Sequence, residues 1–193
     1  MRRVATAACL LLVLLTGCTG SAAKGAAPPP TTSDTAPGGA GADAASVNAV
    51  LAGLDGVMGD LQRILVKQRQ ITPDVTDRLR SIYTGPELLN QIDAFKADVA
   101  SGLVGYKPVP GNRITTVSQL ITATPICMFA QVQRDYSPLA VGLSSKPTTL
   151  YVALVNKDEA DDPKHLNPTP WTMIYDGVQA DGSQPEDPCR ATS

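Results

Sequence analysis

The spacing of apolar residues changes once along this chain, and that change limits the possible folds more than any other feature. Between residues 46 and 102, apolar side chains recur at steps of three and four, the period of a helix with one buried face. From residue 113 onward, shorter runs rich in Val, Ile and Thr are typical of strands. Helices followed by strands predict an α+β domain with an antiparallel sheet, not a doubly wound parallel sheet.

Three helices are expected in the first part. One follows Ser46, which we predict as its N-cap, and carries its apolar stripe over residues 47–65. Another begins at residues 72–74, where a capping threonine precedes a proline and an acid. The third begins at residues 84–87, where a threonine and a glycine are both possible caps, and ends near Gly102. In the first helix three glycines are expected to allow close packing against the sheet: Gly53, Gly56 and Gly59.

Four strands are expected in the second part, forming a curved antiparallel meander against which the helices pack. The first strand has Ile114 and Leu120 on one parity but Val117 and Ile121 on the other, so it needs a bulge. The third strand is apolar on both faces, which is typical of a central strand or one that is covered on both sides. The predicted strands are residues 113–124, 126–133, 148–156 and 171–175.

The chain begins with the features of a bacterial export signal. Arg2 and Arg3 precede an apolar run over residues 4–15, which is shorter than the roughly 20 residues of a membrane-spanning helix. The run ends in Leu-Thr-Gly-Cys, residues 15–18, which resembles the lipobox of bacterial lipoproteins. The resemblance implies that Cys18 receives diacylglycerol and that cleavage precedes it; the alternative is an ordinary secretory signal.

The composition divides the chain into three parts. Residues 1–17 are the expected signal peptide, residues 18–44 are the lipidated cysteine and a flexible linker, and residues 45–193 are a single α+β domain. The linker is rich in Gly, Ala, Ser, Thr and Pro and cannot bury enough apolar surface to order itself. We therefore expect a domain tethered by its lipid to the extracytoplasmic face of the cell membrane.

Two of the four cysteines remain in the exported domain. Cys9 lies in the leader and Cys18 ends it, which leaves Cys127 and Cys189. An exported domain with two remaining cysteines favours one disulfide between them. Two free thiols or a metal site are the alternatives, but a metal site needs more ligands and His165 is the only histidine in the chain.

The charge pattern argues against one class of partner. The chain has 16 Lys and Arg against 18 Asp and Glu, and its formal net charge is -2. Because it has no strong basic stripe, nucleic acid is not an expected partner. Neither a cofactor nor a metal is expected, since no ligand cluster or cofactor motif is present.

The body of the chain resembles the nuclear transport factor 2-like (cystatin-like, cone-shaped) domains of actinobacterial envelope proteins. The resemblance is carried by Tyr-Thr-Gly-Pro-Glu-Leu at residues 83–88, which opens a helix, and by the later strands with Cys127 and Cys189. It implies a bent sheet that curls around the helices and leaves a cavity at its open end. The family usually has a strand between its early helices, and this sequence has no clear strand there.

Candidate site residues come from the strand ends. Asp135 and Tyr136 end the second strand and are the candidates for acid chemistry at a cavity mouth. Trp171 and Tyr175 share one parity of the last strand and are candidates for an aromatic ligand-binding wall, with core packing as the alternative. His165 lies in an acidic, proline-rich loop and is expected to be exposed.

These features favour a non-catalytic binding module over an enzyme. The export signal and linker are well marked, whereas nucleophile-and-base arrangements are missing from the sequence. We therefore expect a membrane-anchored envelope lipoprotein that binds an envelope protein or a small apolar ligand. The alternative is a small isomerase or dehydratase of the cone-shaped fold, using Asp135 or a tyrosine.

Overall fold

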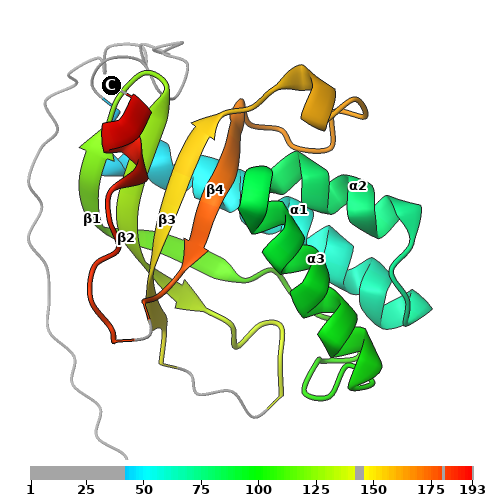
Figure 1. Cartoon of the computed structure of the whole chain (residues 1–193). Coiled ribbons are helices and arrows are strands. Elements are labelled where there is room, and N and C mark those ends of the chain that lie inside the picture. The colour runs from blue at the N-terminus through cyan, green and yellow to red at the C-terminus, as the bar shows by residue number, and fades with distance from the viewer. Residues whose placement is uncertain (1–41, 142–145, 180, 193) are drawn as a thin grey trace, which may run out of the picture. The chain divides into compact units, whose positions relative to one another are not determined.

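A computed structural model of the chain describes residues 42–141, 146–179 and 181–192 (Figure 1). Three helices come first and four strands follow, so the predicted α+β class is confirmed. The helices are α1 (Ala44–Gln68), α2 (Pro73–Ile82) and α3 (Gly85–Ala100). The strands are β1 (Ile114–Ala123), β2 (Cys127–Asp135), β3 (Thr148–Asn156) and β4 (Trp171–Gly177), and short 3-10 turns span Glu159–Asp161 and Pro188–Thr192.

The first helix begins earlier than predicted. Asp43, not Ser46, is its N-cap: the Asp43 carboxylate accepts hydrogen bonds from the Ser46 amide at 2.8 Å and the Ser46 hydroxyl at 2.7 Å. Ser46 therefore lies in the first turn and supports the cap instead of forming it. Thr72 caps α2 as predicted, whereas Thr84 stands at the N-cap of α3 without a capping hydrogen bond from its side chain.

The strands pair in sequence order as an open antiparallel sheet, β1-β2-β3-β4. The pairing of β1 with β2 shifts register twice, after Val117 and after Leu120, so the bulge predicted for β1 is confirmed. The first shift brings Val117 and Leu120, which differ in parity, to the same side of the strand, where both pack against the main core, while Ile114 stays more than half exposed. The irregular edge strand reconciles the mixed parity of its apolar residues.

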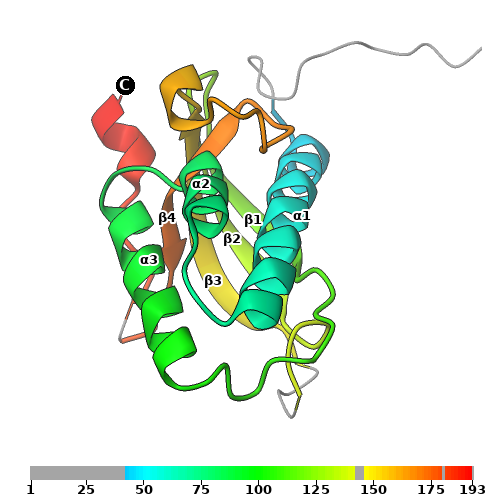
Figure 2. The same ribbon diagram turned by 90° about the vertical axis from the view of Figure 1, so that its right-hand side faces the viewer.

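The two faces of the sheet are covered by different parts of the chain. The helices lie on one face (Figure 2), where Leu150, Val152 and Leu154 of β3 join the main core. On the other face a smaller cluster contains Tyr151 and Ala153, and residues 181–192, called here the C-terminal segment, run beside it (Figure 1). This double cover explains why β3 is apolar on both faces.

A disulfide fixes the C-terminal segment to the sheet. It joins Cys127 of β2 to Cys189, whose Cα atoms are 5.5 Å apart, and closes a loop of 62 residues. Both cysteines are buried in the outer-face cluster beside Phe129. Asp187 adds a second attachment because its carboxylate accepts a hydrogen bond from the Thr122 hydroxyl of β1.

The glycines of α1 allow close approach to loops, not to the sheet. A Cβ atom at Gly53 would lie 2.7 Å from Cγ2 of Thr169, in the loop before β4. At Gly59 it would overlap the side chain of Asn112, which precedes β1, whereas at Gly56 it would meet nothing within 4 Å. The expected close packing therefore holds for two of the three glycines, against different neighbours from those predicted.

Candidate binding cavity

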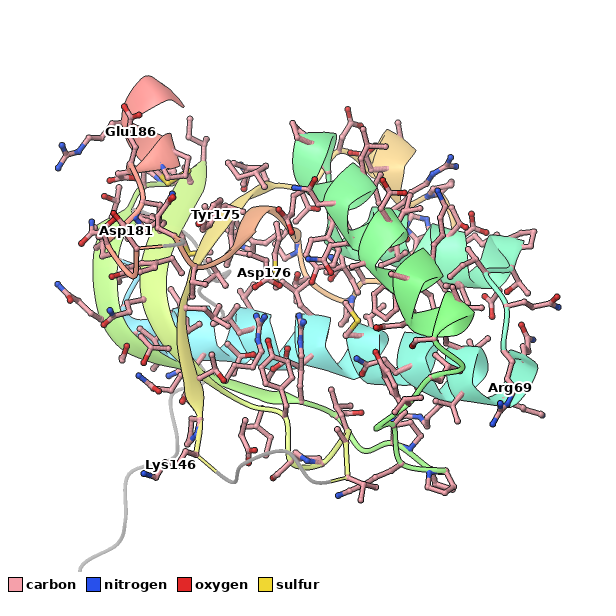
Figure 3. The ribbon with its side chains drawn as sticks, turned by 60° about the horizontal axis from the view of Figure 1, so that its bottom comes forward. Arg69, Lys146, Tyr175, Asp176, Asp181 and Glu186 are labelled. Carbon is pink, nitrogen blue, oxygen red and sulfur yellow. A yellow bond between two sulfur atoms is a disulfide. The ribbon has the colours of Figure 1, made fainter. Side chains whose placement is uncertain are left out.

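A cavity of about 320 Å³ opens between α1, α3 and the inner face of the sheet. Met58 and Gln62 of α1 line one wall, and Phe95 of α3 lines the opposite wall. Arg134 of β2 and Asp176 of β4 close its floor, and Figure 3 places Asp176 centrally, between the sheet and the helices. This volume lies within the range of small-molecule sites.

A second hollow of about 240 Å³ continues this cavity toward the loops. Gln62, Asp98, Tyr106 and Tyr136 line both spaces. The Tyr106 hydroxyl donates a hydrogen bond to the Asp98 carboxylate at 2.7 Å. Beyond this polar pair, the second hollow is lined by apolar residues of the loops after α3 and β2: Val104, Leu139, Ala140 and Val141.

Asp176 holds the floor together through three cationic or hydroxyl partners. Arg134 Nη1 donates to Asp176 Oδ1 at 2.6 Å, and the Tyr83 hydroxyl donates to Oδ2 at 2.8 Å. Arg113 Nη1 lies 3.7 Å from the same carboxylate. All four side chains are at least nine-tenths buried, so these charges interact with little screening from water.

A second carboxylate of this ion cluster, Asp55 of α1, ties the helix to β1. Its Oδ1 accepts from Arg113 Nε at 2.6 Å and its Oδ2 accepts from the Thr115 amide at 2.8 Å. Arg134 Nε in turn donates to the Thr115 hydroxyl at 2.9 Å. The cluster therefore contains two guanidinium groups and two carboxylates, which satisfies the requirement that buried charges be paired.

The protonation states follow from this pairing. Burial opposes ionisation of Asp176, but Arg134 and Arg113, with hydrogen bonds from Arg134 and Tyr83, outweigh burial and hold the pKa of Asp176 below its ordinary value. Burial raises the pKa of Tyr83 far above its ordinary value, so its phenol remains a hydrogen-bond donor. Asp176 is thus a fixed anion whose low basicity makes it a weak candidate for proton abstraction.

Two buried polar atoms around the cavity have no hydrogen-bond partner among the described residues. Nη2 of Arg134 is an unused donor on the floor, and Oε1 of Gln62 is an unused acceptor on the α1 wall. Arg134 is 2% exposed and Gln62 is 5% exposed. Buried polar groups are almost always paired in folded proteins, so these two atoms mark a place where a ligand can supply partners.

The outer part of the cavity is apolar and open. Val104 and Val141 line the second hollow and are 83% and 64% exposed, and Val178 lines the first cavity and is 56% exposed. Because these valines line the space and also reach solvent, they mark where it opens. We call them the valine rim. The site thus grades from a charged floor to an apolar entrance.

The structure separates the two acid-chemistry candidates. The Asp135 carboxylate accepts a hydrogen bond from the Ser137 amide at 2.7 Å, which lowers its pKa, and it does not line either hollow. Tyr136 lines both hollows, and the Arg134 guanidinium lies 6.0 Å from the centre of its ring. Of this pair, Tyr136 lines the cavity, whereas Asp135 is the last residue of β2 and does not line it.

The two aromatic candidates of β4 lie on different faces of the sheet, not on one face as the alternation predicts. Trp171 is 1% exposed in the main core, whereas Tyr175 packs against the outer-face cluster. The register of β3 with β4 shifts between Ala153 and Leu154, and this bulge reverses the alternation between the two aromatics. Neither residue lines the two hollows.

The remaining candidates lie apart from the cavity. His165 is exposed in the loop before β4, as expected. The disulfide partners Cys127 and Cys189 lie on the opposite face of the sheet. In the ranges that the structure describes, no group of three or more possible metal ligands gathers. Cys18, the expected lipidation residue, lies outside the described residues.

Sequence reasoning missed the residues of the ion cluster and the polar residue of the α1 wall. Asp55 and Gln62 occupy positions that continue the apolar stripe of α1 through Leu51, Leu54 and Met58. A charged or amide side chain at a core position is a signal of a buried polar site, and it was available from the sequence. Arg113 and Arg134 were less visible because basic residues at strand ends are usually solvated.

The chain was compared with known protein families, curated proteins and solved structures. No protein-family model, no curated protein and no solved structure matches the chain. Within the described ranges, no helix combines the length and the apolar character needed to cross a bilayer.

Proposed function

We propose that this protein is a lipid-anchored module of the cell envelope whose non-catalytic role is to bind a small, partly apolar ligand in the cavity between α1, α3 and the sheet. The observation that carries the proposal is the pair of buried, unpartnered atoms on Gln62 and Arg134 beside an open cavity of about 320 Å³. The lipobox-like residues 15–18 support the membrane anchor and the extracytoplasmic location.

The resemblance to nuclear transport factor 2-like domains remains part of this proposal. Tyr83, between α2 and α3, forms an isolated parallel bridge with Met173 of β4, and the Thr84 amide donates to the Met173 carbonyl at 3.0 Å. This bridge lies where the family usually has its first strand. One bridged residue in place of that strand supports the resemblance and accounts for the absence of a strand pattern in the sequence.

The proposed enzyme alternative has less support. An isomerase or dehydratase needs a basic or acidic group that is free to exchange a proton with substrate. Asp176 is held as an anion by two arginines. The Asp98 carboxylate already accepts a hydrogen bond from the Tyr106 hydroxyl. Tyr136 is the one earlier candidate that reaches the cavity, and a tyrosine alone without a positioned base is a weak catalyst.

Thermal unfolding of the mature protein with a panel of apolar compounds and lipids tests the ligand. We expect a raised melting temperature with some members, because ligands that bind only the folded state stabilise it. Ala94→Trp, at an exposed position that lines the cavity, should abolish the shift. Ala97→Trp, one turn further along α3, exposed and outside the cavity, is the matched control. A panel without any stabilising compound contradicts the small-ligand form of the proposal.

A partner protein of the envelope is the second form of the same proposal. Exposed apolar side chains at the valine rim would serve a protein as well as a small molecule. Crosslinking in intact cells should then capture one partner, and Val104→Ser should remove it. If neither crosslinking nor the compound panel gives a result, the binding role is refuted.

A further inference from the structure

We propose that the cavity selects amphiphiles with one carboxylate, whose acid group reaches Arg134 on the floor while the apolar body lies toward the valine rim. This inference rests on the proposed binding function and names its ligand class. It begins with Arg134, which uses Nε on Thr115 and Nη1 on Asp176 and leaves Nη2 without an acceptor. An oxygen of a ligand is the missing partner.

The unused guanidinium donor on the floor favours an anionic acceptor. The groups that line the floor are two guanidiniums, Arg113 and Arg134, and one carboxylate, Asp176. Asp55 pairs with Arg113 but does not line the cavity. Both oxygens of Asp176 already accept hydrogen bonds, so the free hydrogen-bonding capacity of the floor is Arg134 Nη2, for which a negatively charged oxygen is the strongest acceptor.

A carboxylate on the cavity wall limits how much negative charge a ligand can carry. Asp98 lines the same space further out, so a doubly charged phosphate would be repelled more strongly than a carboxylate. Gln62 adds adaptable polarity, because rotation of its terminal amide exchanges an acceptor oxygen for donor hydrogens. A singly charged carboxylate is therefore the anion that fits this site.

The outer half of the cavity fits an apolar body. Besides Asp98 and Tyr106, its lining includes four apolar residues: Val104, Leu139, Ala140 and Val141. Val104 and Val141 are mostly exposed to solvent. An apolar ligand that covers them removes apolar surface from water, which favours binding. A polar head at the floor and an apolar chain at the rim match this gradient.

Calorimetric titration of the mature protein compares dodecanoate with methyl dodecanoate, both below micelle-forming concentrations. We expect dodecanoate to bind at least about tenfold more tightly, because the ester lacks the charge that completes the Arg134 site. Gln62→Leu should weaken dodecanoate at least a few-fold without unfolding the domain. Arg134→Lys keeps a positive charge beside Asp176. It should reduce the difference in affinity between dodecanoate and its methyl ester.

The rim provides a pair of matched variants. Val104→Ser should weaken dodecanoate at least about threefold, whereas Val109→Ser should leave it unchanged, since Val109 is 79% exposed and does not line the cavity. Equal binding of acid and ester overturns the carboxylate inference and leaves the binding function intact. The carboxylate inference is also overturned, with the binding function left intact, if dodecanoate does not bind while another compound raises the melting temperature and Ala94→Trp abolishes that rise. If no compound binds, the carboxylate inference and the small-ligand form of the proposed function are both refuted.

Discussion

Asp176 is the residue on which the floor of the cavity depends. Its carboxylate lies between Arg134 and Arg113 and accepts the Tyr83 hydroxyl. Removing one member of a buried ion cluster is costly because it leaves the opposite charges buried without compensation. The cluster also joins α1 to three strands, so its integrity links the helical layer to the sheet.

Asp176→Asn should therefore lower the free energy of unfolding by about 3 kcal/mol, because two buried guanidiniums lose their shared anion. Urea denaturation of the oxidised domain measures the change. Asp93→Asn is the control: its ion pair with Lys96 is exposed, and its removal should change stability by less than about 0.5 kcal/mol. Similar effects of the two substitutions would contradict the buried role of Asp176.

The effect of Asp176→Asn on the free energy of unfolding should depend on pH. The folded-state pKa of Asp176 is depressed below its ordinary value of 3.8, so its contribution to stability is present above that value. It is lost as the pH falls through the depressed pKa. The stability difference between wild type and Asp176→Asn should accordingly be constant near neutral pH and shrink below about pH 4. A difference that grows with acid would have the wrong sign.

Two glycines of α1 provide a second test at the scale of single residues. Gly56→Ala should stabilise the domain by about 0.5–1 kcal/mol, since alanine favours the helix and its Cβ meets nothing within 4 Å. Gly53→Ala should instead destabilise it by about 1 kcal/mol or more, because the added carbon would lie 2.7 Å from Cγ2 of Thr169. Thermal denaturation of both variants gives the comparison, and equal stabilisation would refute the close contact.

The sequence predicted the types and order of the helices and strands better than the local register of the strands. Three helices and four strands follow from periodicity, and β3 has the predicted bounds of Thr148–Asn156. The start of α1 was misplaced because Asp43 and Ser46 are both good caps and the choice depends on the first hydrogen bond. The faces of Trp171 and Tyr175 were mispredicted because a bulge depends on the neighbouring strand.

The cavity was predictable only in outline. The family resemblance implied a space between helices and sheet, but its polar floor is assembled from α1, the start of β1 and the ends of β2 and β4. Asp55 and Asp176 are 121 positions apart in the printed sequence and meet through the arginines between them. No local pattern encodes such a meeting, because it depends on how the layers pack.

The disulfide between Cys127 and Cys189 holds the C-terminal segment against the sheet. Reduction of the disulfide between Cys127 and Cys189 should lower the free energy of unfolding by about 4 kcal/mol, because the 62-residue loop is released in the unfolded chain. Amide exchange should then rise first in residues 181–192. The double variant Cys127→Ala/Cys189→Ala should not respond to reductant. Two thiols that react with an alkylating agent before reduction would contradict the disulfide.

At the scale of the whole molecule, the cavity entrance lies away from the start of the domain. α1 has 25 residues and is about 37 Å long, and residues 42–44 begin it. The loops after α3 and β2 that carry Val104 and Val141 lie near the other end of α1 (Figure 2). The start of α1 and the cavity entrance therefore lie toward opposite ends of this helix.

Anchoring and folding should be separable, because the described core begins at residue 47 and the proposed lipid acceptor is Cys18. We expect Cys18→Ala to move the exported protein from the membrane pellet to the soluble fraction, since this residue is the proposed acceptor of the lipid. The melting temperature of its folded domain should equal that of the wild-type domain. Cys9→Ala, in the leader, is the matched control and should stay in the pellet. A wild-type protein without acyl mass on Cys18, or one found in the soluble fraction, would refute the anchor while leaving the cavity argument unchanged.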